Sequence, residues 1–392
     1  MRRWFERLGL VAVAFAGGAL VSAPLHARTE GDDAYRSLAV FARVLNYVEN
    51  NYVTEIPAKN LIYGAIRGML ATLDAHSAFM DPEQYAAVKS EAQGEFGGIG
   101  VELVKRGDRI ALVEVYSDGP AFAAGVKAHD RLVEVDTMPV LGRSLAEVVR
   151  AIKGPAGSAL VLTVERDGVN GLIELSVVRS RIRAVSVDHV RLGDFGKVSI
   201  RSFTEHTAQD VKAALDALRE SGPIRGLVLD VRDNPGGLLD EAVRIADLWL
   251  ASGIIVSTEG RGRTPDIEYA HPRHTQPDYP IVVLVNGGTA SASEIVAGAL
   301  QDHHRGVVLG TQTFGKGSVQ TVIELEDHSA LKLTIAKYFT PAHRSIQGTG
   351  ITPDVVVPVS RSKNPAPVGR PTDNQLDAAL TLLERWRAGA KP

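Results

Sequence analysis

Apolar residues recur at helical spacing near the start of the chain, between residues 34 and 92. One run consists of Leu38, Phe41, Val44, Leu45 and Val48, and a second of Leu61, Ile62, Ile66, Met69 and Leu70. Intervals of three and four residues place such side chains on one face of a helix. The pattern therefore predicts a small N-terminal helical domain over 34–92.

After Gly94 the pattern changes to short runs rich in β-branched and aliphatic residues. The runs IALVEV at 110–115, RLVEV at 131–135 and ALVLTVER at 159–166 are separated by Gly and Asp, with one helical stretch at 144–153. Short apolar runs bounded by such turn residues are typical of strands. We predict a compact, mostly β module over 93–180.

From about residue 195, strand-like runs alternate with helical patterns at 207–220, 238–250 and 291–302. Alternation of this kind favours an α/β domain, which we expect to occupy 181–360. The segment 361–392 consists of a polar, proline-containing linker followed by an amphipathic helix at 373–388.

The N-terminus has the layout of an export signal. Three arginines, at positions 2, 3 and 7, precede an apolar run over residues 8–23, as in secretory signal peptides. Cleavage after Ala27 would leave Leu25 where a small residue is preferred, so residues 1–27 are either a signal peptide or an uncleaved N-terminal anchor. Both alternatives predict an exported protein of the periplasm or cell envelope.

The composition of the chain excludes several classes of partner and of catalytic chemistry. A chain of 392 residues, 45% of them hydrophobic, can form two or three packed domains. Its formal net charge of −3 provides no basic field, so nucleic acid is not expected as a partner. The absence of cysteine excludes disulfides, thiolate metal sites and a cysteine nucleophile. Nothing in the sequence requires a metal or a cofactor.

The first motif with candidate chemistry is VNGGTASASEI at 285–295, where a strand-like run enters a small-residue turn before a helix. Such a turn can present a nucleophile and free backbone N–H groups at one point. Ser291 and Glu294 also fit a capping box, with Ser291 as the N-cap. The motif alone leaves both interpretations open.

A second motif, GTQTFGKGSVQ at 310–320, places Lys316 between two glycines. It nearly spells a phosphate loop, but Gly317 replaces the required Ser or Thr and the next segment reads as a strand, whereas a phosphate loop opens a helix. A lysine between two glycines can approach a reacting group closely, but it can also be a solvated residue of an ordinary turn, and the motif alone leaves both interpretations open.

A third motif, DVRDNPGG at 230–237, ends a buried strand with paired glycines. Bare N–H groups there suit an oxyanion hole, although ordinary turns also use Pro and Gly. The histidines at 271, 274, 303 and 304 lie in polar, loop-like context without a triad motif, so we interpret them as surface residues.

Together these motifs closely resemble the carboxyl-terminal processing peptidases, or tail-specific proteases, a family of Ser/Lys serine peptidases with a PDZ domain. The resemblance covers nearly the whole mature chain. Its motifs are LDAHSAFM at 73–80, FGGIGVEL at 96–103, DVRDNPGGLL at 230–239, NGGTASASE at 286–294, TFGKGSVQ at 313–320 and GITPD at 350–354.

The resemblance implies roles for individual residues. Its nucleophile falls on Ser291, its general-base lysine on Lys316, and the glutamine that orients that lysine on Gln320. Backbone N–H groups of Gly237 and Ala292 would form the oxyanion hole, with Gly236 as an alternative to Gly237. An aspartate that supports activity in the family matches Asp302, for which a helix-end or solubility role is an equal alternative.

The β-rich module resembles a PDZ domain, in which a loop binds a terminal carboxylate and an edge strand pairs with the peptide. The loop residues are Gly97, Gly98, Ile99 and Gly100. The module departs from the family pattern at His129, where a glycine normally precedes Asp130. The resemblance thus implies a multidomain α/β protein with a small N-terminal helical domain and a PDZ-like module inserted before an α/β protease core.

The implied function is an exported serine endopeptidase that recognises polypeptide substrates by their C-termini and cleaves them through an acyl-enzyme on Ser291. A lipoprotein adaptor and a homodimer are further candidate partners. Two alternatives stay open: a non-catalytic PDZ scaffold or chaperone on a peptidase fold, and an esterase that uses the same dyad on a small substrate.

Overall fold

The computed structural model describes residues 30–183, 185–273, 275–359 and 373–389. The predicted leader at 1–27 lies outside these ranges, as does the linker at 361–372. The chain divides into two compact units, one up to Gly68 and one from Met69 onwards. In the described residues, no helix has the length and apolar character needed to cross a membrane.

The first unit is helical, as the spacing of its apolar residues predicts. It contains α1 (Glu30–Asn51) and most of α2 (Ala58–Leu70). In the second unit, a short strand, β1 (Ala78–Met80), precedes α3 (Pro82–Ala92), where a capping box between Asp81 and Gln84 starts the helix.

The PDZ-like module has its own sheet, in the order β3-β4-β5-β7-β8 with β6 on β5. Its elements are β2 (Glu95–Gly98), β3 (Val101–Arg106), β4 (Arg109–Val115), α4 (Pro120–Ala123), β5 (Arg131–Val135), β6 (Met138–Pro139), α5 (Leu145–Ile152), β7 (Ala159–Glu165), β8 (Leu172–Val178) and β9 (Ser180–Arg183). The strands β2 and β9 pair with each other at the base of the module. Within the described residues β3 ends the sheet, so one of its edges has no strand partner.

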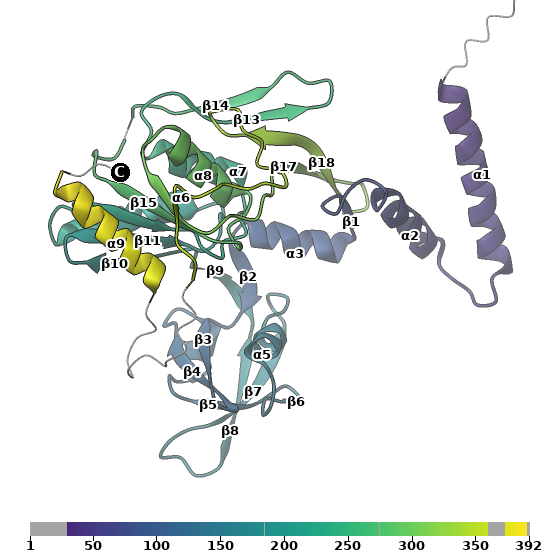
Figure 1. The fold of residues 1–392 in the computed structure, drawn as a ribbon. Coiled ribbons are helices and arrows are strands. Elements are labelled where there is room, and N and C mark those ends of the chain that lie inside the picture. The colour runs from purple at the N-terminus through teal and green to yellow at the C-terminus, as the bar shows by residue number, and fades with distance from the viewer. Residues whose placement is uncertain (1–29, 184, 274, 360–372, 390–392) are drawn as a thin grey trace, which may run out of the picture. The chain divides into compact units, whose positions relative to one another are not determined.

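The central sheet of the larger domain has six strands in the order β10-β11-β12-β15-β16-β19, parallel from β11 onwards (Figure 1). The strands are β10 (Val187–Leu192), β11 (Phe195–Ile200), β12 (Leu227–Asp230), β15 (Ile281–Val285), β16 (Val307–Gly310) and β19 (Val355–Val356). Its helices are α6 (Thr207–Glu220), α7 (Leu239–Asp247), α8 (Ala292–Asp302) and α9 (Asn374–Arg387).

Helices cover both faces of this sheet, which explains why its strands read as continuous apolar runs. Leu227 and Leu229 belong to the core that includes α6, α7 and α8, whereas Val228 between them packs with Ala379 and Leu383 of α9. The α/β prediction and the amphipathic C-terminal helix are therefore confirmed.

A second sheet joins distant parts of the sequence. It consists of β1, β18 (Ala330–Phe339), β13 (Ile254–Gly260) and β14 (Asp266–Tyr269), with β17 (Ser318–Glu324) paired to β18. Thus β1, early in the chain, pairs with residues 330–332 of β18. The strand after the lysine motif, β17, rules out a phosphate loop there, because that loop must open a helix.

Candidate active site

Three loops with candidate chemistry meet at one edge of the central sheet. The glycine pair, Gly236 and Gly237, follows β12. The serine turn, which ends at Ser291, follows β15, and the lysine loop, which contains Lys316, follows β16. These three parallel strands are neighbours. The carboxyl ends of parallel strands open on the same side, where α/β proteins place their sites.

Ser291 has an unusual backbone. Its φ is 57° and its ψ is −119°, whereas an N-cap residue normally has extended dihedrals. Positive φ costs energy in a non-glycine residue and persists only where its surroundings impose it. Here the preceding N–H, of Ala290, donates to the Asn234 carbonyl at 3.0 Å. The Ser291 N–H donates to the Glu294 carboxylate at 2.8 Å. The Glu294 half of the predicted capping box is therefore present, on a strained turn of the kind that presents a nucleophile.

Glu294 joins the serine turn to the lysine loop. Besides the Ser291 N–H, its fully buried carboxylate accepts the Thr313 hydroxyl at 2.5 Å, the Gly315 N–H at 2.8 Å and the Lys316 N–H at 2.9 Å. These donors are neutral, so hydrogen bonds rather than a counter-charge hold the buried carboxylate. The sequence motif indicated only a cap for this residue.

The glycine pair lies directly against the serine turn. A Cβ on Gly236 would approach the Ser291 Cβ to 2.7 Å, and one on Gly237 would approach the Phe203 carbonyl oxygen to 2.1 Å, so neither position has room for a side chain. The Gly236 N–H donates to the Asn234 side chain at 2.9 Å. Within the described ranges, the N–H groups of Gly237 and Ala292 have no partner. This geometry favours Gly237 over Gly236 as an oxyanion donor.

Lys316 is half-buried at the tip of its loop. Burial lowers the pKa of its amine, and the nearby charge of Lys332 lowers it further, while Glu294 opposes the shift. Among the residues described, the Lys316 amine forms no ion pair. It also has no hydrogen bond to Ser291. The Gln320 amide donates to the Ser318 carbonyl at 3.1 Å and hydroxyl at 2.8 Å, and among the residues described Gln320 has no hydrogen bond to the Lys316 amine.

Tyr338 completes the cluster and was not predicted from the sequence. Its buried hydroxyl donates to the Lys316 carbonyl. Burial raises the pKa of this phenol well above its usual range, although a hydrogen bond with the Ser291 side chain acts in the opposite direction. The residue lies 47 positions from Ser291, and no local motif marks it.

Asp302 lies at the other end of α8 from Ser291, about 16 Å along the axis at 1.5 Å per residue. Its carboxylate accepts the Ala342 N–H at 2.9 Å and pairs with Arg344. It therefore fixes the loop after β18, and its support for activity stays a prediction. Of the surface histidines, His271 and His303 contact Asp247 and the Ile254 carbonyl, while His274 lies outside the described residues.

The candidate carboxylate loop consists of the end of β2 and the two residues that join it to β3. Gly97 has no room for a side chain, since a Cβ would approach the Gly154 carbonyl oxygen to 1.9 Å, and Gly100 has a φ of 75°. Ile99 is buried in the core of the module, and Gly98 ends β2. The loop leads into β3, whose outer edge has no strand partner in the part of the chain that the structure describes. Helix α5 contacts β3. His129 adopts a φ of 72°, so it takes the left-handed conformation that the family's usual glycine would supply.

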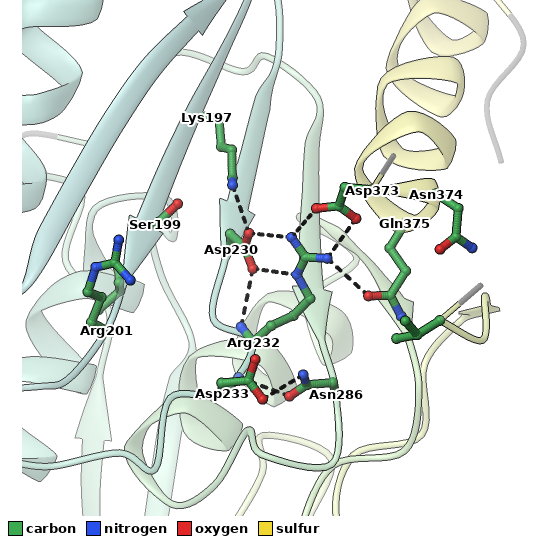
Figure 2. Close-up of a pocket in the computed structure, with 12 residues that line it drawn as sticks. Lys197, Ser199, Arg201, Asp230, Arg232, Asp233, Asn286, Asp373, Asn374 and Gln375 are labelled. Atoms are coloured by element: carbon green, nitrogen blue, oxygen red, sulfur yellow. Dashed lines mark hydrogen bonds and ion pairs between the residues drawn. The ribbon is translucent and has the colours of Figure 1, made fainter. Parts of the chain in front are cut away.

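A polar pocket lies beside the site, at the ends of β11 and β12 (Figure 2). Arg232 binds both oxygens of Asp230, at 2.8 and 2.7 Å, and both oxygens of Asp373, at 2.9 and 2.7 Å. Burial opposes ionisation of Asp230, but Arg232 outweighs it and keeps the pKa of Asp230 low. Because Asp373 caps α9, this pocket anchors the C-terminal helix. Its lining includes neither Ser291 nor Lys316.

The fold and these loops define a serine-type peptidase, and comparison with known proteins agrees. Residues 194–357 match the model of peptidase family S41, residues 97–177 match the PDZ domain, and residues 20–84 match the N-terminal domain of the activating protease CtpB.

Relatives of known type cover most of the chain. A carboxy-terminal-processing protease of Bartonella bacilliformis is 42% identical over 88% of this chain and 81% of its own length. A carboxyl-terminal-processing protease of Synechocystis is 37% identical over 82% and 76%. The solved photosystem II D1 C-terminal processing protease is 31% identical, with a TM-score of 0.51 over 88% of this chain and 96% of that one. The chain therefore belongs to the carboxyl-terminal-processing protease family of serine peptidases, with a PDZ domain.

Proposed function

We propose that this protein is an exported endopeptidase that cleaves polypeptides through an acyl-enzyme on Ser291, with Lys316 as the general base. The neutral amine of Lys316 takes the Ser291 proton, and the serine oxygen attacks the peptide carbonyl. The N–H groups of Gly237 and Ala292 hold the oxyanion. The protonated lysine then gives its proton to the leaving amine, and water hydrolyses the ester.

The observation that carries this proposal is the environment of Lys316. A lysine must lose its proton to act as a base, so its pKa has to fall, and burial of the amine acts in that direction. Glu294 binds the backbone of both Ser291 and Lys316, which keeps the two loops in a fixed relation. Gln320 would orient the amine after leaving Ser318, a side-chain rotation of the kind that accompanies substrate binding.

Replacement of the nucleophile tests the proposal. In Ser291→Ala, cleavage of an unfolded polypeptide should be lost, while the melting temperature changes little because Glu294 still accepts the N–H of residue 291. A cap by itself is worth about 1 kcal/mol. Retained proteolysis together with a lower melting temperature would show that Ser291 is only a helix cap and that another residue supplies the nucleophile.

We also propose that the loop of Gly97, Gly98, Ile99 and Gly100 binds the substrate's terminal carboxylate, with the peptide added to the edge of β3. A polypeptide with an apolar, free C-terminus should be cut faster than its amidated form at concentrations well below saturation. Equal rates would exclude this role. A small ester cut faster than either polypeptide would favour the esterase alternative.

The exposed face of the N-terminal helix bears on whether the protein forms a homodimer. The helix α1 exposes apolar side chains at helical spacing, namely Leu38, Phe41 and Val44 with Tyr35 and Tyr47. We propose that a second copy of the chain covers them in a homodimer, which sedimentation of the wild type and of Leu38→Glu would test.

The arginines and apolar run of the leader support export to the periplasm or cell envelope. No described feature identifies a lipoprotein adaptor.

A further inference from the structure

The hydroxyl of Thr334, on β18, is a buried polar group without a protein partner. Within the described part of the chain, its oxygen is the one buried side-chain nitrogen or oxygen that lacks a hydrogen bond. Buried polar groups are nearly always paired, and an exception in a native fold asks for an explanation. Such departures concentrate at functional sites.

On one side of Thr334 lies Gln320. The two residues are directly opposite each other in the antiparallel pair β17 and β18, so their side chains share a face of the sheet, with Cβ atoms typically about 5 Å apart. The Gln320 amide donates instead to Ser318. Rotation of one side chain would bring the amide to the Thr334 hydroxyl without a backbone change.

On the other side lies the turn before β1. The Thr334 N–H donates to the Ser77 hydroxyl oxygen at 3.1 Å, and the Ser77 hydroxyl donates to Asp74 at 2.9 Å. Burial alone would raise the pKa of Asp74, but the N–H groups of His76 and Ser77 hold it low, so the carboxylate is ionised. The Thr334 hydroxyl lies near enough to add weakly to this effect, without the geometry of a hydrogen bond.

Lys316 faces the same region. Lys332 precedes Thr334 by two residues in β18 and therefore lies on the same face of the strand. Its charge acts on the amine of Lys316. Lys316 precedes β17 by two residues, so Gln320, the third residue of that strand, and Thr334 opposite it lie close to the lysine loop.

We propose that Thr334 is a positioning residue that sets the orientation of the Gln320 amide toward Lys316. An ionised carboxylate only accepts hydrogen bonds, so when the Thr334 hydroxyl turns toward Asp74 it donates a hydrogen bond to that carboxylate. The Thr334 oxygen is then left to accept, and Gln320 must turn its NH₂ group toward it. The Gln320 carbonyl oxygen consequently points to the amine of Lys316. This proposal rests on the Ser291 and Lys316 mechanism above.

The test compares five variants for kcat and KM on an unfolded polypeptide. Thr334→Val removes the hydroxyl and keeps the shape, and Thr334→Ser restores the hydroxyl. Thr321→Val makes the same change on β17 opposite Leu333, on the other face of the strand. Gln320→Ala, alone and with Thr334→Val, completes a double-mutant cycle.

We expect Thr334→Val to lower kcat about three- to tenfold, the value of one hydrogen bond, with KM unchanged. Its melting temperature should hold or rise, because a buried hydroxyl without a partner is removed. Thr334→Ser should retain most of the rate and Thr321→Val all of it. In the Gln320→Ala background, Thr334→Val should have no further effect.

Wild-type kcat in Thr334→Val, or an equal loss with and without Gln320, would overturn the proposal. Loss of activity that only follows a lower melting temperature would also overturn it, since the role would be structural. A Lys316→Ala control distinguishes failure of the Ser/Lys mechanism from failure of the Thr334 proposal. If that variant stays active, the Ser/Lys mechanism itself is wrong. If it is inactive while Thr334→Val is unaffected, only the role of Thr334 is wrong.

Discussion

The candidate catalytic loops and the Arg232 pocket lie at the carboxyl ends of the same sheet, yet buried charged groups are stabilised in opposite ways in the two regions. In the pocket, Arg232 meets two carboxylates through paired hydrogen bonds, and Lys197 adds a third contact to Asp230 at 3.0 Å. At the site, Glu294 is held by neutral donors. Lys316, for its part, has no ion-pair partner within the described ranges.

The difference separates stability from reactivity. A paired charge is fixed in its ionised state, since its partner stabilises that form. An unpaired amine that loses water is pushed toward its neutral form, which is the form that can take a proton. Had Glu294 bonded the Lys316 amine instead of its N–H, the lysine would stay charged and inert. Instead, the Glu294 carboxylate accepts the backbone N–H of Lys316.

Replacement of the lysine by another cation should have the largest effect. Lys316→Arg keeps the positive charge but cannot release its proton at accessible pH, so we expect proteolysis to be lost. The wild-type kcat/KM should rise with pH through the lowered pKa of Lys316, because only the neutral amine is active. Lys337→Arg, an exposed position on the same hairpin, provides the control. Activity in Lys316→Arg would refute the dyad.

Glu294→Gln should have the next largest effect. The new NH₂ group would face N–H or O–H donors, leaving at least one buried donor unpaired at a cost of about 1–3 kcal/mol. Both loops should loosen, so kcat should fall at least tenfold along with the melting temperature. The matched control is Glu241→Gln, which alters a buried carboxylate bound to the Ala208 N–H and Arg244, away from the site. If both variants lose stability but keep equal kcat, Glu294 does not position the site.

Much of this arrangement could be predicted from local patterns. Apolar residues at a period of 3.6 located the helices, and continuous apolar runs located buried strands such as β12, whose alternate residues face two different cores. Strand-then-glycine motifs located the three loops, because a turn after a parallel strand leads to a shared edge.

The rest depends on contacts between residues far apart in the chain. The sequence indicates only a helix cap for Glu294, because its hydrogen bonds with Thr313 and Gly315 join residues 19 and 21 positions apart. Tyr338 has no motif at all. The choice between Gly236 and Gly237 depends on where the Asn234 side chain donates and accepts. The rotation of Gln320 toward Ser318 is a side-chain conformation, which a sequence pattern does not encode.

The smallest effect on catalysis, and a clear effect on stability, should come from Arg232→Met. Removing Arg232 leaves Asp230 and Asp373 without their main partner. Breaking such a largely buried pair costs about 3 kcal/mol, so the free energy of unfolding should fall by about that amount while kcat per folded molecule stays unchanged. Arg201→Met, at an exposed arginine that lines the same pocket and pairs with Asp188, should change stability little, since surface pairs contribute little.

The pH dependence of this loss identifies its cause. Arg232 lowers the folded-state pKa of Asp373 through its hydrogen bonds, and it lowers that of Asp230 against the effect of burial. A carboxylate with a lowered folded pKa stabilises the fold above its unfolded pKa of about 3.9, and this contribution is lost as pH falls through the folded value. The difference between wild type and Arg232→Met, measured by chemical denaturation, should therefore be full at pH 7 and shrink below about pH 4. A difference that persists in acid would mean that Arg232 stabilises the pocket by packing and not by charge, and the contrast with the unpaired Lys316 would fail.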